Sequence, residues 1–179
     1  MSVYTVAAHQ SRINAVFARA AGVTDIQTQA DMSRYLCVLV SGFMERATRH
    51  VYGEYAHARS SPQVARYVER QLEGFMNANA SKLCQVTGAF DGQWGKALDD
   101  YLAGQRKDAL DSIIANRHQI AHGRDVGLTY IRMKSYYDEV KDGHVGRSGV
   151  TGFVWVGAFP RERSRPPRAR DSSVDLQVD

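Results

Sequence analysis

The chain has 179 residues, of which 44% are hydrophobic and 23% are charged. This composition predicts one soluble globular domain with a buried core, with room for a tail. The chain has 23 Lys and Arg against 19 Asp and Glu, which gives a net charge of +4. This charge is compatible with a polyanionic partner but does not require one. The longest apolar run, 35–40, is far shorter than the ~20 residues of a membrane-spanning helix, and no secretory signal is evident. We therefore expect a cytoplasmic protein without membrane insertion.

The two cysteines, Cys37 and Cys84, form no Cys-x-x-Cys pair. Neither a disulfide framework nor a thiolate zinc site is therefore expected. Cys37 lies inside the apolar run, which predicts a buried small hydrophobic residue. Four other histidines are scattered and lack the carboxylate spacing of a metal site. We therefore expect neither a metal nor another cofactor.

The region before residue 142 is predicted to form one helix after another, because its apolar residues recur at three- and four-residue steps. The pattern predicts helices over about 3–20, 25–57, 62–76, 82–90, 93–102, 106–122 and 127–141. The longest of them carries its apolar residues along one stripe, as expected for a helix that packs in a core. The sequence therefore favours an all-α bundle with a long early helix.

The composition changes after residue 141. Five glycines lie around the apolar segment 153–156, which is compatible with a short strand or an apolar anchor. The segment 161–170 holds five arginines and two prolines. We therefore predict a helical domain, 1–141, followed by an irregular Gly-, Arg- and Pro-rich tail, 142–179. The tail is either a flexible solvated segment or an arm that grasps phosphates and orders on RNA.

Most of the chemical information lies at the end of the helix predicted over 106–122. Four cationic or titratable side chains gather there, namely Arg117, His118, His122 and Arg124. One interpretation is structural, because cations in a last turn interact favourably with the helix dipole and Gly123 is a natural cap. The other is functional, because imidazoles exchange protons near neutral pH and guanidinium groups bind phosphate bidentately.

Two copies of this helix end, packed about a two-fold axis, would bring their cationic groups into one cleft. A histidine would take the proton of a ribose 2′-hydroxyl, which then attacks the adjacent phosphorus. An arginine would stabilise the charge that develops on the non-bridging oxygens. The residues alone leave both alternatives open: a capped helix end, or metal-free cleavage of RNA by a homodimer.

The sequence Arg117-His118-Gln119-Ile120-Ala121-His122-Gly123 resembles the Arg-x4-6-His motif of the HEPN superfamily, most closely the RiboL-PSP-HEPN group. The resemblance covers roughly residues 25–140 and includes the order of a long early helix and a late motif helix. It implies a four- to five-helix bundle that dimerises. It also implies either a metal-independent endoribonuclease of a toxin–antitoxin, anti-phage or RNA-processing system, or a non-catalytic member that binds RNA or a protein.

The resemblance assigns a role to each motif residue. Arg117 would stabilise the reacting phosphate and His122 would be the general base or acid, which leaves a 2′,3′-cyclic phosphate and a 5′-hydroxyl. His118 occupies a polar position, commonly Asn or Asp, where it would assist or form hydrogen bonds. Candidate RNA-binding residues, which are alternatively ordinary solvated charges, are Glu45, Arg46, Arg49 and Arg124.

One departure from the family pattern concerns regulation. In toxins paired with a nucleotidyltransferase, a tyrosine stands two residues after the motif histidine, whereas this chain has Arg124 there. Control by modification of such a tyrosine is therefore not expected. The expected partners are a second copy of the chain, an RNA substrate and a cognate antitoxin.

Overall fold

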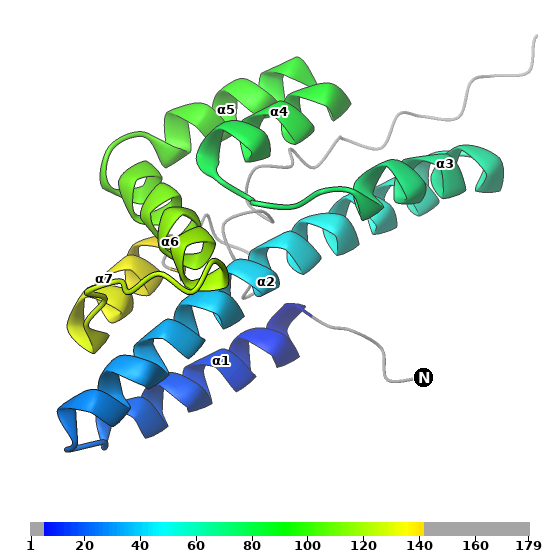
Figure 1. The fold of residues 1–179 in the computed structure, drawn as a ribbon. Helices are drawn as coiled ribbons and strands as arrows, with labels where there is room; N and C mark the ends of the chain where they lie inside the picture. The colour runs from blue at the N-terminus through cyan, green and yellow to red at the C-terminus, as the bar shows by residue number, and fades with distance from the viewer. Residues whose placement is uncertain (1–5, 142–179) are drawn as a thin grey trace, which may run out of the picture.

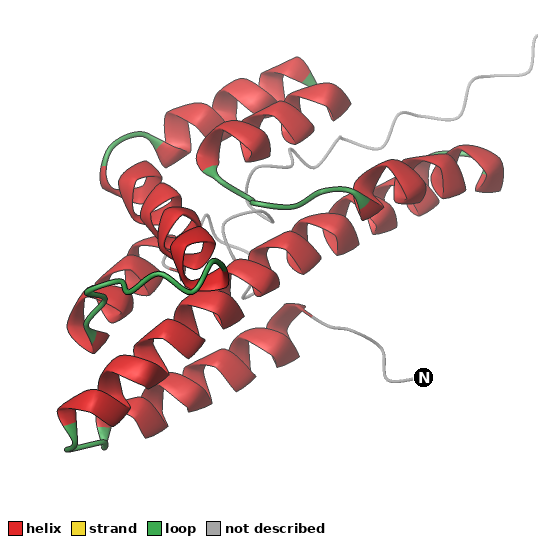
Figure 2. Cartoon of the chain, in the orientation of Figure 1, coloured by secondary structure: helices red, strands yellow, loops and turns green. Residues whose placement is uncertain are grey.

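The computed structural model describes residues 6–141, and these residues form seven α-helices (Figure 1). The helices are α1 (Val6–Ala21), α2 (Ile26–Arg59), α3 (Pro62–Glu73), α4 (Ala80–Phe90), α5 (Gly92–Leu102), α6 (Gln105–Ala121) and α7 (Tyr130–Lys141). This part of the chain contains no strand, which confirms the all-α prediction (Figure 2). The predicted tail lies outside the described residues, so its boundary and its two interpretations stay predictions.

Local sequence signals set the helix boundaries. The side chain of Asp25 accepts a hydrogen bond from the Thr28 N–H at 2.7 Å and begins α2. The side chain of Asp91 accepts hydrogen bonds from two N–H groups of the first turn of α5. Such caps satisfy donors that a helix start leaves without partners. The helices therefore begin and end close to the predicted breaks.

The long α2 and three other helices form a four-helix bundle. Helices α1, α6 and α7 pack against α2, and α7 also packs against α6 and α1 (Figure 1). The core of this bundle consists of large side chains that are almost fully buried, among them Leu36, Phe43, Ile113, Met133 and Tyr137. A four-helix bundle with a long early helix agrees with the expected architecture.

The remaining helices extend the bundle on the side of the carboxyl-terminal half of α2. Helix α3 packs back along α2, and α4 and α5 form a tight hairpin next to α6 (Figure 1). The hairpin depends on two glycines, because a Cβ added to Gly95 would lie only 2.7 Å from the Cα of Gly88. No helix in the described part of the chain is long and apolar enough to span a membrane.

Candidate active site

Helix α6 ends in a hydrogen-bonded cap that fixes the position of the motif. The N–H of Gly123 donates to the Ile120 carbonyl and the N–H of Arg124 donates to the Gln119 carbonyl, both at 3.0 Å. This pair of bonds is a Schellman motif, which requires a left-handed residue after the cap. Gly123 has a φ of +67° and supplies it, as the sequence predicts. His122 is consequently held as the capping residue of α6.

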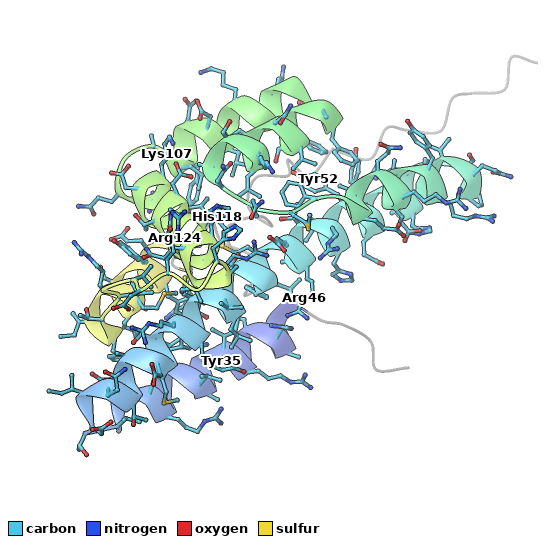
Figure 3. The ribbon with its side chains drawn as sticks, in the orientation of Figure 1. Tyr35, Arg46, Tyr52, Lys107, His118 and Arg124 are labelled. Atoms are coloured by element: carbon cyan, nitrogen blue, oxygen red, sulfur yellow. The ribbon has the colours of Figure 1, made fainter. Side chains whose placement is uncertain are left out.

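The two motif histidines lie next to each other on the surface. The ring centroids of His118 and His122 are 4.4 Å apart, and the planes meet at 71°. Residues four apart on a helix share one face, which explains the contact. Both side chains are exposed, and His118 projects from the end of α6 in Figure 3. The imidazoles are therefore accessible to a substrate.

Arg117, by contrast, is partly buried and held by another segment of the chain. Its Nη1 group donates a hydrogen bond to Oδ1 of Asn77 at 3.1 Å. Asn77 lies in the loop between α3 and α4, where it is the one non-glycine residue with a positive φ, +56°, in the described part of the chain. The backbone of this loop thus aims an amide oxygen at the guanidinium group.

Glu45 of α2 holds Asn77 in this conformation. Its Oε1 atom accepts a hydrogen bond from the N–H of Asn77 at 2.7 Å. Glu45 is only 7% exposed, and no other charged residue between residues 6 and 141 is as buried. Because a buried carboxylate needs hydrogen bonds to replace its lost hydration, this contact is structurally important. We call the series Glu45, Asn77 and Arg117 the arginine relay.

Close packing of α6 on α2 lies beneath the relay. The thiol of Cys37 is fully buried and donates to the carbonyl of Ile113 at 3.3 Å. Burial raises the pKa of Cys37 to about 12, although the nearby Arg117 charge and backbone hydrogen bond act in the opposite direction. Cys37 is therefore a buried packing residue, as predicted.

The candidate RNA-binding residues of α2 point in different directions. Glu45 faces the loop before α4 and reaches Arg117 through Asn77. Arg49 is partly buried, and its Nε donates to the carbonyl of Glu45 at 3.3 Å. Arg46 instead lies toward α1, with its Nη2 atom 3.2 Å from Nε2 of His9 (Figure 3). The structure therefore brings Glu45, but not Arg46, to the motif arginine.

His9 has an environment that favours a neutral ring. Burial lowers the pKa of His9 below its ordinary value, and the charges of Arg46 and Arg12 lower the pKa further. A neutral imidazole can accept the hydrogen bond from Arg46. The contact holds Arg46 on the α1 side of the long helix.

Arg124, the last of the sequence candidates, is exposed and lies just after the cap. Its Nη1 atom donates to Oε1 of Gln119 at 3.0 Å. It therefore stays close to the histidine pair (Figure 3). Within residues 6–141, no three His, Cys, Asp or Glu side chains gather in a way that would hold a metal ion.

Sequence reasoning did not identify Asn77. Residues 77–81 are polar and predict a loop, but a polar loop carries no sign of the helix it will contact. The only signal available was indirect, because Asn adopts the left-handed region more readily than other non-glycine residues. The partnership with Arg117 depends on a contact across 40 positions of the chain.

Comparison with known proteins confirms the family resemblance. A family model described as RiboL-PSP-HEPN matches residues 7–143, a span that includes the arginine relay and both motif histidines. No curated protein and no solved structure gave a match. HEPN domains generally dimerise and bind RNA. Since the match covers most of the chain, the protein belongs to the RiboL-PSP-HEPN family.

Proposed function

We propose that the protein is a metal-independent endoribonuclease that acts as a homodimer. One observation carries the proposal: a partly buried arginine, positioned by an uncharged acceptor, lies on the same helix end as two exposed imidazoles. Membership in a HEPN family supports RNA as the substrate. The reaction is attack by a ribose 2′-hydroxyl, which leaves a 2′,3′-cyclic phosphate and a 5′-hydroxyl.

Arg117 is the proposed phosphate-binding group. A guanidinium group has five N–H donors. Among the described residues, the Arg117 side chain donates only to Asn77 and forms no ion pair. Because Asn77 is uncharged, the contact orients the side chain without neutralising it. The positive charge is therefore available to stabilise the non-bridging oxygens of the scissile phosphate.

His122 is the proposed general base or acid, and His118 assists it. A proton must leave the 2′-hydroxyl and another must reach the 5′-oxygen of the leaving nucleotide. The ring contact at 4.4 Å gives the imidazoles of one chain a shared site beside the substrate. A second copy related by a two-fold axis would add two more imidazoles and a second Arg117 to the cleft.

The test uses labelled single-stranded RNA with excess EDTA throughout. Replacing Arg117 or His122 with Ala should slow cleavage on the order of 100-fold or more. Arg132→Ala, which removes an exposed arginine from α7, is the matched control and should cleave like the parent. Helicity and dimer mass should be the same for all variants, and mass spectrometry should detect the cyclic phosphate.

Two outcomes would contradict the proposal in different ways. Equal cleavage by Arg117→Ala and the parent protein would contradict the mechanism, because Arg117 would not stabilise the reacting phosphate. Salt-sensitive retention of RNA without products would instead identify a non-catalytic dimer in which the arginines only position phosphates.

A role as a toxin or defence effector in the cytoplasm, silenced by a cognate antitoxin, belongs to the same proposal. Induced expression of the parent chain should then arrest growth, whereas expression of His122→Ala should not. Growth arrest by both chains would argue against this role, because toxicity would not depend on cleavage.

A further inference from the structure

A second feature of the surface is an apolar groove between the carboxyl-terminal half of α2, α3 and α4. The groove has a volume of about 820 Å³ and is lined by residues that include Tyr55, Tyr67, Phe75 and Met76. Tyr67 and Met76 are 63% and 55% exposed, so the apolar lining is open to solvent. The bundle core does not account for these exposed side chains, and the proposed reaction does not use them.

The wall of the groove is formed before any ligand binds. The ring of Tyr55 makes edge contacts with Phe90 and Trp94, at centroid distances of 6.0 and 5.2 Å. Phe90 also stacks on the buried Tyr52, with centroids 4.5 Å apart. These contacts fix one aromatic side of the groove. The exposed Tyr67 lies on α3, on the other side.

The charges that line the groove are of one sign. Among residues 6–141, the charged side chains that line it are Arg59 and Lys82, and the amide side chains are Gln71 and Gln85. Aromatic faces bordered by cations and hydrogen-bonding amides are the elements that bind single-stranded nucleic acid. The volume is also in the usual range of a site for a small ring-shaped ligand. The lining therefore complements a flat aromatic base that is attached to a phosphate.

The groove and the arginine relay share one loop. Phe75 and Met76 line the groove, and the next residue, Asn77, holds Arg117. Lys82 closes this end of the groove, because its Nζ donates to the carbonyl of Met76 at 3.0 Å. Adjacent Cα atoms are ~3.8 Å apart, so the two sites lie on neighbouring residues of the same backbone.

We propose that this groove binds an unpaired nucleobase of single-stranded RNA, close to the phosphate held by Arg117. Tyr67 provides a stacking face, while Arg59 and Lys82 contact the adjoining phosphates. The inference rests on the proposed function in taking RNA as the ligand, and it adds the site that selects an unpaired strand over a paired one. A duplex would keep its bases stacked inside and could not fill the groove.

Binding of a fluorescein-labelled mixed-sequence RNA tests the proposal, in EDTA and on a His122→Ala background, which should cleave on the order of 100-fold more slowly and keeps the Arg117 side chain. Tyr67→Ala should raise the Kd about tenfold, since a stacked base contributes on that scale. Tyr35→Ala, the control, removes an exposed tyrosine near the other end of α2 and should change the Kd less than about twofold (Figure 3). Binding of inorganic polyphosphate, which has no bases, should be the same for both variants.

Photo-crosslinking gives a readout that does not depend on substitutions in the groove. RNA that contains 4-thiouridine should crosslink to peptides that carry Tyr67 or Met76. Crosslinks confined to α6 and the residues after it, or an unchanged Kd for Tyr67→Ala, would overturn the proposal. In that case the groove would fit an apolar protein segment instead.

The inference and the proposed function can fail separately. If the parent protein and Tyr67→Ala cleave RNA at the same rate in EDTA, the base site is overturned and the proposed nuclease activity still stands. Tyr67-dependent binding of RNA by a parent protein that never cleaves would overturn the nuclease and support the base site.

Discussion

Two parts of the same helix end are positioned in different ways. Arg117 is partly buried and held through Asn77 by Glu45 of another helix. His118 and His122 are exposed and contact each other. The fold of one chain therefore orients the proposed phosphate-binding cation in advance, whereas the imidazoles are placed only by the helix and its cap. In the proposed homodimer, the RNA and the second chain would complete the histidine side of the site.

Among the substitutions that leave Arg117 and both histidines in place, the largest effect is expected from breaking the arginine relay at Asn77. Glycine tolerates the φ of +56°, so Asn77→Gly removes the acceptor oxygen and keeps the backbone conformation. We expect kcat for RNA cleavage to fall about tenfold, the scale of one lost hydrogen bond to a charged group, with little change in KM. Steady-state kinetics in EDTA measure both constants.

A conservative variant separates positioning from folding at this residue. Asn77→Gln keeps an uncharged amide oxygen that can accept from Arg117 without neutralising its charge, so it should recover part of the kcat that Asn77→Gly loses. Thermal unfolding should show that both variants fold. A parental kcat for Asn77→Gly would mean that the relay does not orient Arg117 for the reaction.

A smaller effect is expected from disturbing the cap on the histidine side. Gly123→Ala places a Cβ on a residue with φ +67°, which should lower the free energy of unfolding by about 1 kcal/mol. No neighbouring atom lies within 4 Å of the added Cβ, so backbone strain is the only cost. Denaturant titration measures the change.

Gly92→Ala is the matched control for the cap. The added Cβ at Gly92 also meets no atom within 4 Å, and this glycine does not have a positive φ. We expect no loss of stability there. Equal destabilisation at both glycines would argue that the left-handed cap does not fix His122.

The last prediction concerns the alkylation of cysteine thiols, which tests how tightly α6 packs on α2 next to Arg117. Only the thiolate form of cysteine is alkylated, and burial raises the pKa of Cys37 to about 12 and that of Cys84 to about 11. Iodoacetamide should therefore leave Cys37 unmodified in the folded protein at neutral pH and should label it after unfolding. As the pH rises, Cys84 should react first, because its thiol has the lower pKa and is more exposed.

Mass spectrometry of the native protein reads out both thiols. Labelling of Cys37 at the rate of Cys84 would show that α6 opens from α2. The segment of α6 that carries Arg117 would then be no more rigid than the exposed end that carries the two histidines.

The accuracy of the sequence predictions depended on the range of the interactions. Helix ends lie close to their predicted positions at Asp25, Asp91 and Gly123. A cap is made with residues a few positions away, so its signal is local in the sequence. The helix predicted to continue to Met76 ends instead at Glu73. Phe75 and Met76 continue the apolar period, but their side chains line the groove beyond the helix.

The sequence by itself determined the helices, the cap after His122 and the shared face of the two histidines. Each of these follows from backbone hydrogen bonds and from side chains within about one turn. Only the tertiary structure decided that Glu45 reaches Asn77, that Asn77 reaches Arg117, and that Arg46 turns toward α1. These contacts join residues 32 to 40 positions apart, and their geometry depends on how whole helices pack.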